Sequence, residues 1–193
     1  MMRAALVAVL LLVGCREAAP EKMSLRFGTF GSSPVVHTHF SIEQPMGEIG
    51  QPVLIHSFAD RRYPRFDGSD ALIGGPRDAG EDGIWRVEAQ WTELLTGKSW
   101  RAAVDVPVDR MTRGSGAVNF QVIFGPNGLL EIDSDQAGPK PLAEVNTIGR
   151  TCGTRVSEAD RDWTVSGLFP GKQERTLAAV TPPVGPPTCP PRD

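Results

Sequence analysis

Two histidines near the start of the chain are the residues best suited by type and spacing to do chemistry. His37 and His39 stand one residue apart, Glu43 follows, and Gly31 and Gly50 flank the group. On a strand, side chains alternate between the two faces, so the two imidazoles would share one face. Two imidazoles and a carboxylate brought together can bind a transition metal. The spacing therefore raises the hypothesis of a metal site, and with it that of an enzyme.

These five positions resemble the first motif of the cupin metal-binding barrels. The resemblance implies a cupin-like metalloenzyme that uses His37, His39 and Glu43. The residues after Glu43 depart from that pattern, because Pro45 and Gly47 interrupt the strand that should continue there.

The second cupin motif is also incomplete, since Glu131 stands where a histidine should follow the Pro126-Asn127-Gly128 turn. A site of His37, His39, Glu43 and Glu131 is the alternative that this pattern leaves open. The simpler prediction is a strand with both histidines on its solvent side and an apolar face of Val36, Thr38, Phe40 and Ile42. We therefore expect no metal and no other cofactor.

A second candidate for chemistry is the carboxylate pair Asp133 and Asp135, which would lie on one face of a strand. Nothing apolar in the surrounding sequence would raise their pKa, so a solvated pair beside a turn is the expectation. The chain has no Gly-x-Ser-x-Gly elbow and no phosphate-binding loop. We expect no catalytic residues and no enzymatic activity.

The segments that would position these residues have the alternation of strands. Alternating apolar residues run through 25–29, 36–42, 85–91, 100–106 and 118–124. Thr96-Gly97-Lys98 and Pro126-Asn127-Gly128 predict hairpin turns between neighbouring runs. A further strand is expected near residues 142–148, and a short helix is expected to start at Ser157. The fold predicted is mostly β: two packed antiparallel sheets, sandwich-like, with one or two short helices.

The N-terminus has the features of a bacterial export signal. Arg3 precedes an apolar run over residues 4–13, which is too short to span a bilayer as a mature helix. The end of this run, Leu12-Val13-Gly14-Cys15, resembles the lipobox of bacterial lipoproteins. The resemblance implies a signal peptide over residues 1–14, lipid attachment at Cys15 and a tether over 15–22. Because Arg16 is not aspartate, it also implies an outer-membrane location, with the domain facing the periplasm or the cell surface.

Two further cysteines, Cys152 and Cys189, are expected to form a disulfide in such an oxidising compartment. The bond would pin a proline-rich tail (181–193) to a single β-rich domain (23–180). The net charge is −3 and no basic run occurs, so nucleic acid is not an expected partner.

The segment from Ser57 to Trp85 differs from the rest, because it shows little alternation and is long for a connection within one domain. It contains a cluster with the composition of a protein-binding hot spot: Arg61, Arg62, Tyr63, Arg65 and Phe66. These residues are the candidate partner-binding site. The alternative is a solvated loop whose aromatic side chains pack back onto the domain.

Two stretches together suggest a family. Residues Val87–Met111, with Trp91, Trp100 and a Pro107 exit, and Val118–Val145, with its Pro-x-Gly turn, resemble a family of uncharacterised bacterial lipoproteins. Genes of that family often lie near type VI secretion genes for lipase effectors. The resemblance implies an immunity protein that binds and blocks a secreted phospholipase at the membrane. The competing hypothesis is a structural or assembly lipoprotein of the envelope.

Overall fold

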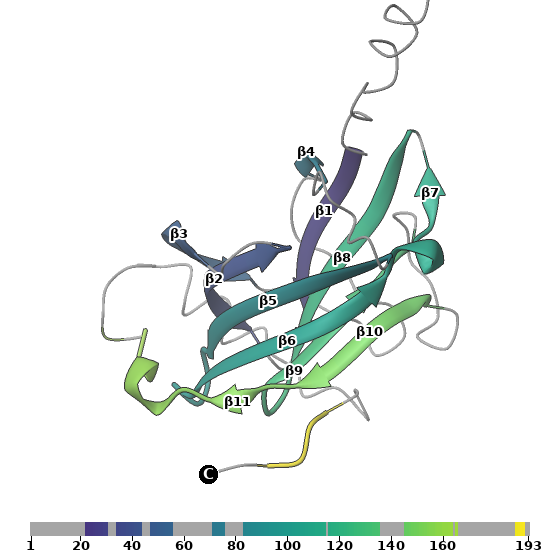
Figure 1. Cartoon of the computed structure of the whole chain (residues 1–193). Coiled ribbons are helices and arrows are strands. Elements are labelled where there is room, and N and C mark those ends of the chain that lie inside the picture. Colours follow the sequence, from purple (N-terminus) through teal and green to yellow (C-terminus); the bar gives the residue numbers. More distant parts are fainter. Residues whose placement is uncertain are drawn as a thin grey trace, which may run out of the picture.

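Two β-sheets face each other across an apolar core, as the strand pattern predicted (Figure 1). The computed structural model describes residues 22–30, 34–43, 47–55, 71–75, 83–114, 116–135, 145–163, 165 and 188–191. No helix among these residues is long and apolar enough to cross a membrane.

The first sheet, sheet A, has the strand order β10-β9-β8-β1-β4, with β7 paired to β8 beside this path. Its strands are β1 (Lys22–Thr29), β4 (Ala71–Gly74), β7 (Arg113–Gly114), β8 (Ala117–Gly125), β9 (Leu129–Asp133) and β10 (Thr147–Cys152). Strands β1 and β8 run parallel, whereas every other pair in this sheet is antiparallel. A parallel pair needs a long crossover connection, and here the strands of the other sheet supply it.

The second sheet, sheet B, is antiparallel throughout and has the order β11-β6-β5-β2-β3. Its strands are β2 (Val35–Ile42), β3 (Gly47–Ile55), β5 (Ile84–Glu93), β6 (Ser99–Pro107) and β11 (Thr154–Arg155). Strands β5 and β6 form its centre, and their predicted inward residues are all buried: Trp85, Val87, Ala89, Trp91, Trp100, Ala102, Val104 and Val106.

Both predicted hairpins are confirmed. The first joins β5 to β6, where Gly97 has a φ of +68° and its N–H donates to the Glu93 carbonyl oxygen at 2.9 Å. The second joins β8 to β9, where Asn127 and Gly128 have φ values of 58° and 79°. Asparagine and glycine are the residues that adopt such positive φ values most readily.

Three sequence predictions need correction. The sheets are not wholly antiparallel, because β1 pairs with β8. In place of a helix at Ser157 there is a single 3-10 turn, η3 (Ser157–Ala159), and a similar turn, η1 (Val108–Arg110), follows β6. The strand expected near 142–148 begins at Thr147, with residues 141–144 outside the described part.

The Ser57–Trp85 segment also contains the edge strand β4, and residues 56–70 and 76–82 on either side of this strand are not described.

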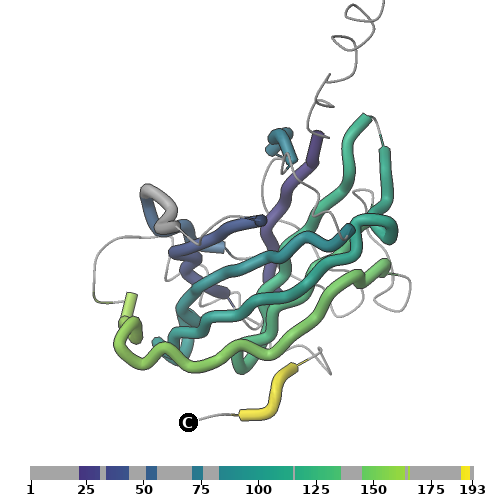
Figure 2. The backbone as a smooth tube through the Cα atoms, viewed as in Figure 1, coloured from purple at the N-terminus to yellow at the C-terminus, as the bar shows by residue number. Residues whose placement is uncertain are grey.

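One stretch of chain crosses from sheet A to sheet B. Strand β10 pairs with β9, and after Gly153 the chain continues as β11, which pairs with β6 (Figure 2). The N–H of Gly153 donates to the carbonyl oxygen of Gly128 at 2.8 Å. A Cβ atom at Gly153 would lie 2.9 Å from the Arg101 carbonyl oxygen, so glycine is what lets the crossing chain approach β6 this closely.

The chain end is attached at the same corner. Cys152 and Cys189 form a disulfide, in agreement with the predicted pairing. The Asn127 side chain donates to the Cys189 carbonyl oxygen at 3.0 Å. Cys189 is buried in a small cluster on the outer side of sheet A, with Phe30, Ile123 and Leu129. The described part of the proline-rich tail is therefore held against the β8–β9 turn.

Candidate functional site

The two histidines do not share a face, because strand β2 contains a β-bulge between them. In the ladder with β5, His37 pairs with Trp91 and His39 with Gln90, so Thr38 has no opposite residue. The Thr38 hydroxyl donates to the Gln90 carbonyl oxygen at 3.1 Å and accepts from His39 Nδ1 at 3.0 Å. An extra residue shifts every following side chain to the other face. His37 consequently faces the core and His39 the outer side of sheet B.

His37 is a core residue, and its predicted place on the solvent side was wrong. Its side chain is 2% exposed and its ring packs against Phe27, Phe40 and Phe124, with centroids 4.9, 5.7 and 5.2 Å away. Nε2 donates to the His39 carbonyl oxygen at 2.9 Å. Burial disfavours the charged imidazolium and lowers the pKa of His37 to about 4. The ring is therefore neutral at pH 7.

The remaining residues of the cupin-like set lie far from such a site in the fold. Glu43 directly follows the end of β2, and its backbone N–H donates to the Arg86 carbonyl oxygen at 3.0 Å while its carboxylate accepts from the Arg86 N–H. Glu131 lies on β9, opposite Ile123 and Arg150, on the outer side of sheet A. Within the described ranges, no group of three or more histidine, cysteine, aspartate or glutamate residues is arranged to hold a metal ion. The structure does not bring the His37, His39, Glu43 and Glu131 set together.

The carboxylates at the end of β9 are buried, so the prediction of a solvated pair was wrong. Asp133 is 0% and Asp135 7% exposed. Neither carboxyl oxygen of Asp133 has a hydrogen-bond partner among the described residues. Burial, followed by repulsion from Glu131, raises the pKa of Asp133 to about 7, and Thr147 and Arg150 offset only part of the rise. The outer side of sheet A is covered at this end, as the buried side chains of Gln121 and Ile123 also show.

Glu131, next to this carboxyl on the same face, keeps an ion-pair partner. Arg150 binds it with two nitrogens, Nε at 2.6 Å and a terminal nitrogen at 2.5 Å. Burial raises the pKa of Glu131, while the Arg150 guanidinium opposes the rise. Two carboxyl groups in one buried row cannot both be ionised at low cost, and Arg150 favours the charge on Glu131. Asp133 is then the group that holds a proton below pH 7.

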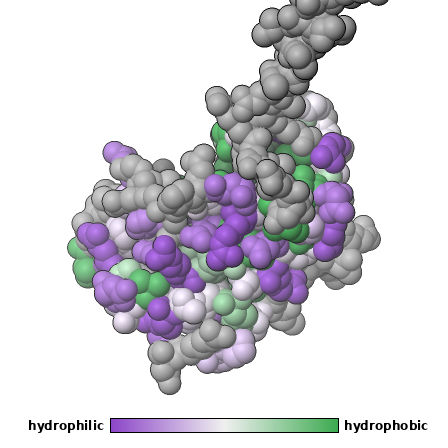
Figure 3. Space-filling view, viewed as in Figure 1, coloured by the Kyte–Doolittle hydropathy of each residue, from purple (hydrophilic) through white to green (hydrophobic). Residues whose placement is uncertain are grey.

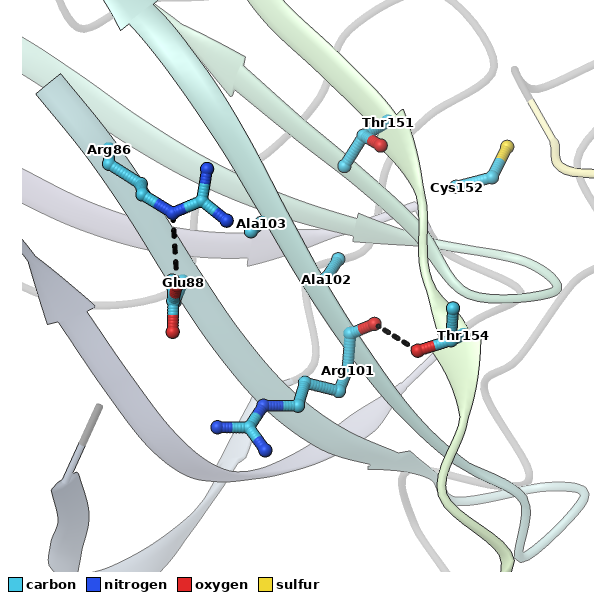
Figure 4. A pocket seen from close by; sticks show the side chains of 8 residues that line it. All are labelled: Arg86, Glu88, Arg101, Ala102, Ala103, Thr151, Cys152 and Thr154. Atoms are coloured by element: carbon cyan, nitrogen blue, oxygen red, sulfur yellow. Dashed lines mark hydrogen bonds and ion pairs between the residues drawn. The ribbon is translucent and has the colours of Figure 1, made fainter. Parts of the chain in front are cut away.

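The outer face of sheet B carries exposed polar groups and a pocket. Figure 3 shows mostly hydrophilic side chains on this side of the molecule, over β5 and β6. A pocket with a volume of about 420 Å³ lies where β6 separates from β10 (Figure 4). We call it the β6–β10 pocket. It is lined by Arg86, Glu88, Arg101, Ala102, Ala103, Thr151, Cys152 and Thr154.

The lipid-attachment residue Cys15 and the candidate partner-binding residues Arg61, Arg62, Tyr63, Arg65 and Phe66 lie outside the described residues. Their roles stay predictions.

The sequence reasoning missed the β6–β10 pocket, although part of its signal was present. The alternation that buried Trp100 and Ala102 also placed Arg101 and Ala103 on the outer face. The hairpin register then put Arg86 and Glu88 on the same side as Arg101. No local pattern indicated that the chain crosses from β10 to β11 beside β6, and this crossing supplies Thr151 and Thr154.

Comparison of the chain with models of known protein families, with curated proteins and with solved structures finds no match. The lipoprotein-family resemblance inferred from the sequence therefore stays a prediction.

His37 and Asp133 are both buried and titratable, and their contributions to the free energy of unfolding should change in opposite directions with pH. The folded-state pKa of Asp133 is raised from 3.8 to about 7, so the stability it contributes is full below pH 4 and is lost as pH rises toward 7. The folded-state pKa of His37 is lowered from 6.5 to about 4, so its contribution is full above pH 6.5 and is lost as pH falls toward 4. Between pH 4 and 6.5 the two effects offset each other.

Single substitutions should separate these two contributions when the free energy of unfolding is measured in urea at several pH values between 4.5 and 6.5. Relative to the parent, Asp133→Asn should become more stable as pH rises, and His37→Phe should become less stable. One unit of pKa difference is worth about 1.4 kcal/mol. The difference in free energy of unfolding between each variant and the parent should therefore change by about 2 kcal/mol between pH 4.5 and 6.5. Variants whose differences from the parent do not change with pH would contradict this assignment.

Proposed function

We propose that this chain is a lipid-anchored lipoprotein of the bacterial outer membrane whose β-sandwich faces the periplasm and serves as a non-catalytic binding module. We further propose that its partner is a type VI phospholipase effector, which the module binds and inhibits as an immunity protein. The observation that carries the location is a lipobox-like Leu12-Val13-Gly14-Cys15 on a chain whose two other cysteines form a disulfide.

The disulfide supports an envelope location on chemical grounds. Disulfides persist in the periplasm, whereas cytoplasmic thiols are kept reduced. Cys152 and Cys189 are 37 residues apart in the sequence, and closing a loop of that length is worth about 4 kcal/mol in the chain-entropy estimate. A domain that relies on such a bond is suited to an oxidising compartment.

The binding role is supported by the polar outer face of sheet B and by the composition of residues 61–66. Arginine and aromatic residues that lie close together in the sequence, as do Arg61, Tyr63 and Phe66, have the composition of interface hot spots. The choice of a phospholipase as partner rests on the family resemblance alone.

One observation favours the structural or assembly alternative. Strand β4 is an edge strand of sheet A, and all four of its residues are exposed, with Leu72 at 62% and Ile73 at 38%. An exposed apolar edge can accept a strand from another protein. An assembly lipoprotein would use such an edge, whereas an immunity protein does not need it.

The anchor is tested by metabolic labelling with a palmitate analogue. The parent chain should be labelled, and Cys15→Ser should lose the label, because the thiol of Cys15 is the proposed acceptor. Cys189→Ser serves as the control for removal of a cysteine elsewhere and should keep the label. Equal labelling of the parent and Cys15→Ser would remove the lipoprotein proposal.

The partner is tested by affinity capture of the chain from its own organism, followed by binding measurements with the purified captured protein. A secreted lipase should be enriched, and Tyr63→Ala with Arg65→Ala should weaken its binding by about 2 kcal/mol, roughly thirtyfold. The melting temperature should hardly change. The control, Leu95→Ala with Arg113→Ala, removes one apolar and one cationic side chain that are exposed on the described surface, and it should bind like the parent.

Two outcomes would count against this proposal. Capture of envelope assembly proteins without a lipase would favour the structural alternative. Unchanged lipase affinity in the Tyr63 and Arg65 variant would place the interface outside residues 61–66.

A further inference from the structure

The start of β1 is the point at which the proposed lipid tether enters the described domain. Lys22, the first residue of β1, follows Cys15 by seven positions in the sequence. Seven residues of fully extended chain span at most about 25 Å. With the acyl chains of Cys15 inserted in the bilayer, the end of sheet A that contains Lys22 is held within that distance of the lipid surface.

The edge strand β4 exposes two apolar side chains at this same end of the sheet. It pairs antiparallel with the first four residues of β1, with Leu72 opposite Ser24 and Ile73 opposite Met23. Leu72 is 62% and Ile73 38% exposed. Figure 1 shows β4 beside the start of β1 at the top of the view, whereas β11 lies at the bottom. Both apolar side chains therefore lie beside the first three residues of β1, next to the entry of the tether.

A basic side chain accompanies Leu72. Lys22 is exposed, and its partner on β4 is a glycine, which has no side chain to cover it. Alternation along the two strands places Lys22 and Leu72 on the same outer face of sheet A, as diagonal neighbours. Leucine beside lysine suits a membrane interface, because the apolar group enters the boundary of the acyl chains while the ammonium stays among the headgroups.

The neighbouring strands keep this end of the sheet basic. Arg113 of β7 is exposed and pairs with Val118 of β8, which in turn pairs with Met23 of β1. The turn η1, which precedes β7, adds one exposed acid and one exposed base, Asp109 and Arg110, whose charges offset each other. The described residues of this end therefore complement an anionic lipid surface.

We propose that the β4 edge surface, formed by Leu72, Ile73 and Lys22, docks on the lipid bilayer that holds the anchor. This inference deepens the proposed function and rests on the lipidation of Cys15. Leu72 and Ile73 enter the boundary between headgroups and acyl chains, and Lys22 contacts anionic headgroups. A partner strand is the other occupant that an edge accepts. The bilayer is favoured because the tether brings it to this edge, and because a strand of four residues offers few backbone groups for pairing.

The docked edge fixes the orientation of the domain. The start of β8 lies beside β1, and the opposite end of β8 leads into the turn of Gly128, whose N–H donates to the Glu93 carboxylate at 3.1 Å. Glu93 ends β5, so the β5–β6 turn lies at the end of the domain away from the β4 edge surface. Docking therefore turns the β5–β6 turn away from the membrane.

The docking is tested by tryptophan fluorescence of the full lipidated chain in vesicles of phosphatidylcholine and phosphatidylglycerol. Vesicles with brominated acyl chains are compared with unbrominated ones, because bromine quenches a tryptophan that lies against the acyl chains. Leu72→Trp should lose a larger share of its emission than the parent, whose tryptophans are all buried. The matched control is Leu95→Trp, since Leu95 is 50% exposed in the β5–β6 turn, and its loss should equal that of the parent.

The charge is tested in the Leu72→Trp background. Lys22→Gln should lower the ratio of docked to undocked protein about fivefold, the contribution of one basic side chain near an anionic surface. Arg101→Gln removes an exposed positive charge from the outer face of sheet B and should leave the ratio unchanged. Vesicles without phosphatidylglycerol should lower the ratio in the Leu72→Trp chain as well.

Two results would overturn the proposal. They are quenching of Leu72→Trp no greater than that of Leu95→Trp, which would leave the edge to a partner strand, and equal effects of Lys22→Gln and Arg101→Gln. Urea unfolding midpoints near that of the parent exclude loss of the fold as the cause. Palmitate labelling of the same preparations separates the two proposals: labelled protein without quenching rejects the docked edge alone, whereas unlabelled protein rejects the lipid anchor and the docking together.

Discussion

The close approach of two glycines to strand β6 is the contact on which the rest of this structure depends. Gly128, in the β8–β9 turn of sheet A, lies directly against the Trp100 ring, where a Cβ atom would come within 2.4 Å of a ring carbon. Its N–H donates to the Glu93 carboxylate of sheet B at 3.1 Å. Its carbonyl oxygen accepts from Gly153, where the chain crosses between the sheets. One corner thus joins the turn, the crossing strand and the central tryptophan of sheet B.

The functional features follow from that corner. Because the chain passes from β10 to β11 at Gly153, Gly149 of β10 and Thr154 of β11 both contact β6, and the pocket lined by Arg101 lies between these two contacts. The disulfide partner Cys152 immediately precedes the crossing, so the Cys189 segment is held next to the same turn. The pocket and the attachment of the chain end therefore share one structural support.

Strand positions and hairpins could be read from the sequence, because they depend on local alternation and on turn residues such as Asn127 and Gly128. The burial of the His37 and Asp133 side chains could not be read from the sequence. A single extra residue at Thr38 reverses the faces of β2, and the pattern Val36, Thr38, Phe40 and Ile42 fits an unbroken strand equally well. The burial of Asp133 depends on what covers the outer side of sheet A, which is a long-range property. The parallel pairing of β1 with β8 is likewise decided by topology, since both segments look like ordinary strands.

The most direct test of the role of this corner is the free energy of unfolding of Gly128→Ala, compared with Gly116→Ala. Both glycines have a positive φ, 79° and 78°, but a Cβ atom at Gly116 would meet nothing within 4 Å. The shared backbone strain should cost each variant about 1 kcal/mol. The clash with Trp100 should cost Gly128→Ala at least about 2 kcal/mol more, because a packed core admits added atoms poorly. Equal losses in the two variants, measured by urea unfolding, would contradict the view that the two sheets are joined at this corner.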